Sequence, residues 1–142
     1  MKTAQEGIVV LDSKYQIIKE YKQVIDRIEH KGKEYQKLSS AQAFLTWIHK
    51  NLKVTERVEM VDCNNIEFEE NTVFTDGLGL EKFDRSDRKF VVVALNSNSN
   101  PKIIVSIERG WLKHLEALKH LNLNIDLICP GLNEKIARNK KR

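Results

Sequence analysis

The chain has 142 residues, a formal net charge of +4, 41% hydrophobic residues and 31% charged residues. These values predict a single folded core, and they exclude a disordered chain and a membrane-spanning protein. The first ten residues lack the zones of a secretory signal, and no apolar run approaches the length of a bilayer span. Cys63 and Cys129 are too far apart in the sequence to form a ligand pair, so we expect a reducing, cytoplasmic setting.

The positive charge is concentrated at the C-terminus, and a mild basic balance is compatible with a polyanionic partner without requiring one. We expect one domain over residues 1–133, followed by a basic tail over residues 134–142. This tail is either a solvated, frayed end or an arm that contacts phosphates. Its basic residues are Lys135, Arg138, Lys140, Lys141 and Arg142.

The N-terminal part begins with a strand and a helix. The continuous apolar run Ile8–Leu11 predicts a buried parallel strand that ends at Asp12. Apolar residues then recur at helical spacing over residues 17–28 and predict an amphipathic helix, which Gly32 ends.

A second helix and a second strand follow. Ser39 or Ser40 is the expected N-cap of the helix. Residues 58–61 predict a strand. Residues 62–82 are rich in Asn, Glu and Gly, so we expect a long surface connection there.

Asp87 precedes an apolar run and predicts the N-cap of a helix that is buried over Phe90–Leu95. Its side chain is expected to accept the unpaired N–H groups of the first helical turn. Its negative charge would suit the positive end of the helix dipole.

The rest of the chain alternates strand, helix and strand. Ile103–Val105 and Ile125–Cys129 predict strands, with a helix from Trp111 to Leu121 between them. This alternation is typical of α/β proteins with βαβ units and a parallel sheet. We therefore expect the strands at Ile8, Ile103 and Ile125 to be parallel neighbours in one sheet.

Several carboxylates fall where α/β proteins place functional groups, at strand ends and helix starts. These are Asp12, Asp87 and Glu108, and Glu20 follows in the first helix. Oxygen ligands without His or Cys suit Mg²⁺ or Mn²⁺, which support phosphodiester cleavage. The alternative is that Asp87 only caps its helix, Glu20 is solvated and Asp12 belongs to a turn.

Three segments together resemble PIN-like ribonuclease domains. Ile8–Asp12 followed by Ile17–Tyr21 looks like the family's strand and Glu-bearing helix. Ser86–Ala94 is similar to its third motif, in which an Asp heads a buried helix. Ile103–Glu108 resembles the strand that ends in Thr/Ser-x-Asp. The similarity runs over roughly residues 8–129 in the family's order.

The resemblance implies a three-layer α/β/α sandwich with a mainly parallel sheet. It also implies metal-dependent endonucleolytic cleavage of single-stranded or structured RNA. Glu20, Asp87 and Glu108 would be the catalytic ligands of Mg²⁺ or Mn²⁺. Asp84 would be a fourth ligand, or a hydrogen-bond acceptor next to the ligands. We expect these carboxylates to converge on one side of the sheet.

Further roles follow from the same resemblance. Asp12 and Ser106 would support the metal-binding residues without touching the cation. Arg88, Lys89 and Arg109 would contact the nucleic acid.

The match leaves no counterpart in this chain for the family's first strand and its terminal Asp, so the chain resembles an N-terminally shortened member. Glu108 also stands where the family usually has Asp. The alternative function is therefore an inactive PIN-like remnant that binds RNA or a protein partner. An incomplete sheet would also favour homo-oligomers.

Overall fold

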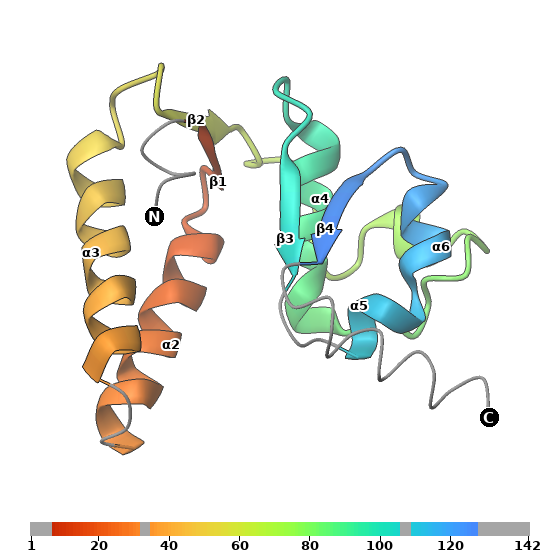
Figure 1. The fold of residues 1–142 in the computed structure, drawn as a ribbon. Coiled ribbons are helices and arrows are strands. Elements are labelled where there is room, and N and C mark those ends of the chain that lie inside the picture. The colour runs from red at the N-terminus through yellow and green to blue at the C-terminus, as the bar shows by residue number, and fades with distance from the viewer. Residues whose placement is uncertain (1–6, 32–34, 106–108, 128–142) are drawn as a thin grey trace. The chain divides into compact units, whose positions relative to one another are not determined.

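The computed structural model describes residues 7–31, 35–105 and 109–127 (Figure 1). The chain divides into two compact units, Met1–Asn64 and Asn65–Arg142. Each unit contains one pair of parallel strands. The expected site residues Ser106 and Glu108 and the basic tail lie outside the described residues, as does Cys129.

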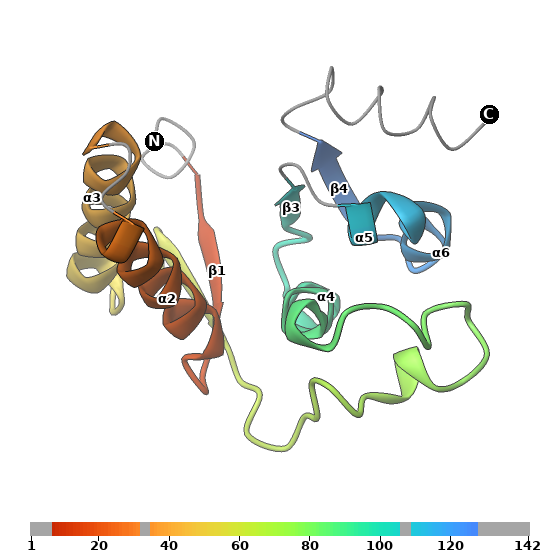
Figure 2. The ribbon, with the colours of Figure 1, turned by 90° about the horizontal axis from the view of Figure 1, so that it is seen from below.

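The first unit is built on two parallel strands that pair from Val9 opposite Val58 to Asp12 opposite Val61. Parallel neighbours need a crossover connection, and two helices supply it. These helices lie side by side (Figures 1 and 2). In chain order the elements are β1 (Val9–Asp12), α2 (Gln16–Lys31), α3 (Tyr35–Asn51) and β2 (Val58–Val61).

The amphipathic pattern of α2 explains how the two helices pack. Ile17, Ile18 and Ile25 are buried, as expected for one face of a helix whose residues recur every 3.6 positions. Tyr21 meets Phe44 of α3 edge-on, with ring centroids 5.4 Å apart. Burial raises the pKa of Tyr21, because the charged phenolate would lose its hydration.

The predicted start of the second helix is wrong. α3 begins at Tyr35, so Ser39 and Ser40 lie inside the helix rather than at its N-cap. Serine before an apolar stripe is a cap signal, but Gln36, Lys37 and Leu38 are good helix formers that extend the helix toward the N-terminus. The predicted strand over residues 58–61 is confirmed.

The second unit is built on β3 and β4, which pair in parallel from Lys102 opposite Asn124 to Val105 opposite Leu127. This pairing confirms the predicted parallel strands at Ile103 and Ile125. α4 packs against β3 (Figure 2). The unit contains the 3₁₀ turns η1 (Thr72–Phe74) and η2 (Arg85–Asp87), then α4 (Arg88–Asn96), β3 (Lys102–Val105), α5 (Arg109–Lys113), α6 (Leu115–Lys119) and β4 (Asn124–Leu127).

An aromatic cluster lies in the core of the second unit. The ring of Phe83 stacks on Phe74 at 6.0 Å and meets Trp111 edge-on at 5.0 Å. Such pairs contribute about 0.5–1.5 kcal/mol beyond the area they bury. The buried members of this core are Phe74, Leu80, Phe83, Val91, Val92, Val105, Trp111 and Leu118.

The predicted buried helix after Asp87 is confirmed. α4 buries Val91, Val92, Val93 and Ala94. Both ends of the predicted stretch depart from it, because Phe90 is only partly buried and Leu95 is 39% exposed.

Residues 62–82 are not the plain surface connection that their composition predicts. Phe74 and Leu80 are 1% and 0% exposed and belong to the core. Between them, Gly77 and Gly79 adopt positive φ values of 76° and 84°, a conformation in which glycine carries no steric cost. The polar composition concealed these two core residues because they are irregularly spaced and match no helical or strand period.

The expected helix from Trp111 to Leu121 is divided into α5 and α6. The break falls at His114, with φ −104° and ψ 12°. Leucines three residues apart drift around a helix that has 3.6 residues per turn, so one straight helix could not bury them all. The break lets Leu118 reach the core, where it is 0% exposed.

The architecture is mixed α/β with short parallel strands in two small sheets. The expected single sheet is not observed among the described residues, because β1 pairs with β2 and β3 pairs with β4.

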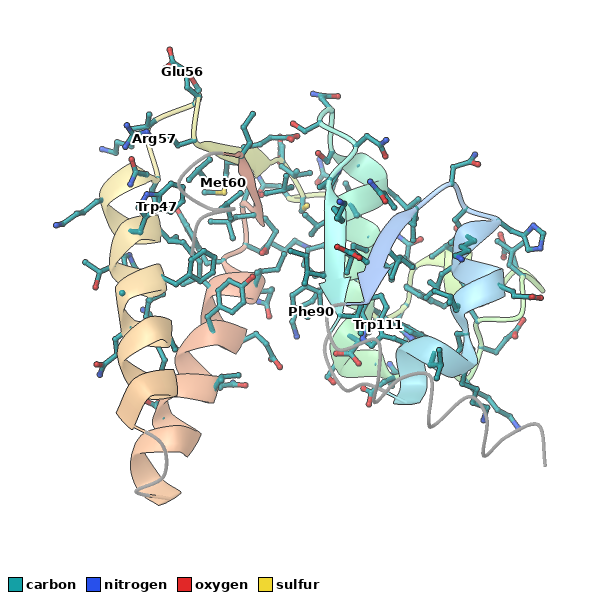
Figure 3. The ribbon with its side chains drawn as sticks, viewed as in Figure 1. Trp47, Glu56, Arg57, Met60, Phe90 and Trp111 are labelled. Carbon is teal, nitrogen blue, oxygen red and sulfur yellow. The ribbon has the colours of Figure 1, made fainter. Side chains whose placement is uncertain are left out.

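Trp47 lies on α3 in the first unit and Trp111 on α5 in the second (Figure 3). None of the helices in the described part of the chain is long and apolar enough to cross a bilayer.

Candidate functional site

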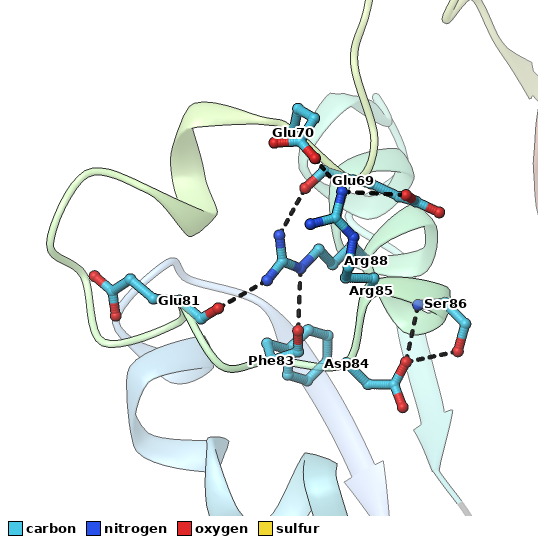
Figure 4. A network of polar contacts seen from close by, with 8 residues as sticks. All are labelled: Glu69, Glu70, Glu81, Phe83, Asp84, Arg85, Ser86 and Arg88. Atoms are coloured by element: carbon cyan, nitrogen blue, oxygen red, sulfur yellow. Dashed lines mark hydrogen bonds and ion pairs between the residues drawn. The ribbon is translucent and has the colours of Figure 1, made fainter.

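The candidate site is the turn that carries Asp84 and Asp87 into α4. Asp84 is the N-cap of η2, and its Oδ1 accepts hydrogen bonds from the backbone N–H of Ser86 at 2.9 Å and from its hydroxyl at 2.7 Å (Figure 4). These two bonds, chiefly that from the hydroxyl, hold the pKa of Asp84 below its usual value. The charges of Lys89 and Arg88 add to this effect. Asp84 is therefore a carboxylate that stays ionised.

Asp87 lies at the N-cap position of α4, as predicted, but its side chain makes no capping hydrogen bond. The capping role expected of this carboxylate is wrong, because Asp87 has helical backbone angles (φ −93°, ψ −10°), whereas a capping residue usually has an extended backbone that lets its side chain reach the N–H groups two or three residues ahead. In the 3₁₀ turn the N–H of Asp87 already donates to Asp84, and that of Arg88 to Arg85. Asp84 supplies the side-chain cap one turn earlier.

Arg88 is the buried cation of this region, with 5% exposure. Its Nε donates to the carbonyl of Phe83 at 3.1 Å, Nη2 to that of Glu81 at 2.9 Å and Nη1 to that of Glu69 at 2.6 Å (Figure 4). Its guanidinium carbon lies 4.6 Å from the centroid of the Phe74 ring. Resemblance assigns Arg88 to nucleic-acid contact. The contacts that the structure describes instead hold the protein's own backbone.

The other basic residues of the turn lie closer to the surface. Arg85 pairs with Glu70 and, at 3.4 Å, with Glu69, and all three side chains are more than half exposed. Glu70 is the main cause of the raised pKa of Arg85. Lys89 donates from Nζ to the carbonyl of Ser86 at 2.6 Å.

Asp12 occupies the end of β1, where the sequence placed it, and is 0% exposed. Its Oδ2 accepts the N–H of Gln16 and its Oδ1 that of Ile17, both at 2.9 Å. A carboxylate in this place pairs N–H groups that have no partner inside the helix and suits the positive end of the helix dipole. The role of Asp12 in the structure is thus to fix the start of α2.

The remaining expected residues belong to other elements of the chain. Glu20 lies in α2 of the first unit, whereas Asp84 and Asp87 belong to the second. Arg109 is the first residue of α5. The convergence of Glu20, Asp87 and Glu108 therefore stays a prediction.

A polar junction at the carboxyl ends of β1 and β2 was missed by the sequence analysis. Ser13 donates its N–H to the carbonyl of Val61 at 2.9 Å, and its hydroxyl accepts the N–H of Cys63 at 2.8 Å. Cys63 is 0% exposed, and burial, reinforced by the charge of Asp12, raises the pKa of its thiol. The Asp-Ser pair at the end of a predicted strand was the available signal, since strand ends in parallel sheets commonly meet.

Metal binding depends on which donor side chains lie close together. Within residues 7–31, 35–105 and 109–127 there is no group of three or more His, Cys, Asp or Glu that could hold a cation. Asp84 and Asp87 are hard oxygen donors, and Mg²⁺ is commonly held by one or two carboxylates together with waters and substrate phosphates. The described donors therefore fit a magnesium ion in chemical type, and further ligands would come from elsewhere in the chain.

Comparisons of this chain with protein-family models, with curated proteins and with solved structures gave no match.

Proposed function

We propose that this chain is a PIN-like nuclease domain that cleaves RNA endonucleolytically with a divalent cation. The proposal includes a three-layer α/β/α sandwich, for which the short parallel strands and their helical crossovers give support at the level of an α/β fold. The observation that carries the proposal is the acidic turn. There, a carboxylate with a lowered pKa, Asp84, lies three residues before Asp87 at the start of a buried helix.

In this proposal Glu20, Asp87 and Glu108 hold Mg²⁺ or Mn²⁺, and Asp84 adds negative charge beside them. The bound cation would favour hydroxide over water and stabilise charge on the phosphate. An aspartate carboxyl group is ionised at neutral pH, and the two hydrogen bonds from Ser86 keep Asp84 ionised to lower pH. Lys89 and Arg109 would attract the phosphates of the RNA backbone.

The test measures cleavage of single-stranded and hairpin RNA by the purified protein in Mg²⁺, in Mn²⁺ and in chelator. Asp87→Asn and Glu20→Gln should each lower cleavage by at least about tenfold, since metal sites are sensitive to changes even around their ligands. Glu56→Gln is the matched control, because Glu56 is an exposed glutamate outside the expected site (Figure 3). Cleavage that persists in chelator, or that survives Asp87→Asn, would contradict the proposal.

The alternative is a PIN-like module without catalytic activity that binds RNA or a protein. The residue that favours it is Glu108, which stands where the family usually has Asp. It predicts RNA binding that is unchanged by Asp87→Asn and by chelator, with no cleavage. Electrophoretic mobility shift with the same RNAs, together with light scattering to detect homo-oligomers, distinguishes the two functions.

A further inference from the structure

The turn that carries both carboxylates is closed into a loop by one side chain. The Nε of Arg88 donates to the carbonyl of Phe83 at 3.1 Å (Figure 4). The residues enclosed by this bond run from Asp84 to Asp87. The hydrogen bond therefore fixes the backbone on which the two carboxylates of the proposed site are mounted.

Both ends of this loop are anchored in the core of the second unit. Phe83 is 2% exposed and packs against Phe74 and Trp111. On the other side, α4 is anchored by Val91, which is 0% exposed. A loop with fixed ends and a cross-bond has few conformations left.

The same guanidinium connects the loop to two other segments of the backbone. Its Nη1 and Nη2 reach the carbonyls of Glu69 and Glu81. Its face lies on the ring of Phe74. A lysine could bring a positive charge to this position, but its point-like ammonium cannot reproduce a planar fork that stacks on a ring and donates in three directions.

We propose that Arg88 is a positioning residue: it holds the Asp84–Asp87 loop in one conformation, so that its carboxylates are preorganised to receive a divalent cation. The part of this statement that concerns the cation rests on the proposed function. Preorganisation matters because a site must hold its ligands to within about half an ångström of the productive geometry.

The first measurement is amide hydrogen exchange by NMR on the full chain, and it does not depend on metal binding. In the Arg88→Lys variant the N–H groups of Ser86 and Asp87 should exchange at least about tenfold faster, a change worth about 1.4 kcal/mol in opening free energy. Amides in the middle of α4, such as that of Val92, should keep their protection. Uniform loss of protection across the second unit, or no loss at all, would overturn the proposal.

Arg85→Lys is the matched control, since Arg85 lies in the same loop but its described ion pairs are with the exposed carboxylates of Glu69 and Glu70. It should leave exchange at Ser86 and Asp87 as in the wild type. If Arg88→Lys fails to fold, the wild type still gives an answer. The Nε–H of Arg88 should exchange much more slowly than that of Arg85, and equal rates would overturn the proposal.

The second measurement is the affinity for Mn²⁺, from water-proton relaxation. Arg88→Lys should bind Mn²⁺ about tenfold more weakly than the wild type, as is common when groups around metal ligands are replaced. An unchanged affinity would refute the role of Arg88 in cation binding. If the wild type binds no Mn²⁺, the proposed function fails, whereas the exchange measurement still decides whether Arg88 holds the loop.

Discussion

Ser86 donates both its backbone N–H and its hydroxyl to a single carboxylate oxygen of Asp84, at 2.9 and 2.7 Å. Both bonds favour the charged form of the carboxyl group, which is why the pKa of Asp84 is lowered. The turn before α4 is therefore most stable when Asp84 is ionised.

The pH dependence of stability follows from this relationship. A lowered pKa in the folded state stabilises the protein above the ordinary carboxyl pKa of about 3.9, and this contribution disappears as the pH falls through the folded value. Asp84→Asn lacks the contribution at every pH. We therefore expect the urea midpoints of wild type and Asp84→Asn to differ at neutral pH and to approach each other under acidic conditions. A difference that does not shrink on acidification would contradict this.

The two tryptophans allow each unit to be followed separately. Trp47 lies in the first unit and Trp111 in the second, so a Trp→Phe replacement at one leaves the other as the reporter.

Asp12→Ala should destabilise the first unit by about 2 kcal/mol, because two N–H groups of α2 would lose a buried acceptor. The measurement is urea unfolding followed by Trp47 emission in a Trp111→Phe background. Asp26→Asn, at an exposed position of the same helix, serves as the control and should change the midpoint little. Equal effects of the two variants would show that Asp12 does not cap α2.

Phe83→Ala should destabilise the second unit by about 3–5 kcal/mol, the usual cost of removing a buried aromatic ring. The loss includes the contacts with Phe74 and Trp111. Trp111 emission in a Trp47→Phe background reports the transition. Leu78→Ala, at a residue that is 49% exposed, should leave the stability within about 0.5 kcal/mol of the parent.

Arg85→Gln should have no measurable effect on stability. The ion pairs of Arg85 with Glu69 and Glu70 are solvent-exposed, and such pairs are screened by water and salt. Urea unfolding of wild type and variant at low and at high salt checks this. A clear destabilisation at low salt would mean that the segment with Glu69 and Glu70 is held by Arg85 as well as by Arg88.

Cys63 should react slowly with a thiol reagent in the folded protein. Its side chain is buried and its pKa is raised, so the reactive thiolate is scarce and inaccessible. In a Cys129→Ser background the labelling rate should rise when urea is added. In the folded protein it should also rise with pH, but only at a higher pH than an exposed thiol requires. Labelling in native buffer as fast as in urea would contradict the buried position.

Local patterns were sufficient to predict several elements. The mainly apolar segments Val58–Val61 and Ile103–Val105 are bounded by polar residues, and they form strands. The start of α4 after Asp87 was likewise predicted, because an acidic residue before a run of valines has few other interpretations.

The contacts that define the acidic turn had no local signal. Nothing near Arg88 in the sequence indicates that it would reach the carbonyl of Glu69. Charged residues are usually exposed, so a buried arginine is a poor prediction from composition. Arg88 packs on the buried ring of Phe74, and the polar composition around Phe74 gave no indication that this ring belongs to the core.

The sequence separation of the contacts in the first unit indicates the order in which its elements form. Tyr21 and Phe44 belong to successive helices, and their contact closes a short stretch of chain, whereas Val9 must find Val58 across both helices. Contacts between distant residues form later because their loop-closure entropy must be met first. We therefore expect α2 and α3 to assemble early and the ladder between β1 and β2 late. The junction of Ser13 with Cys63, at the far end of that ladder, would be among the last parts of the unit to become ordered during folding.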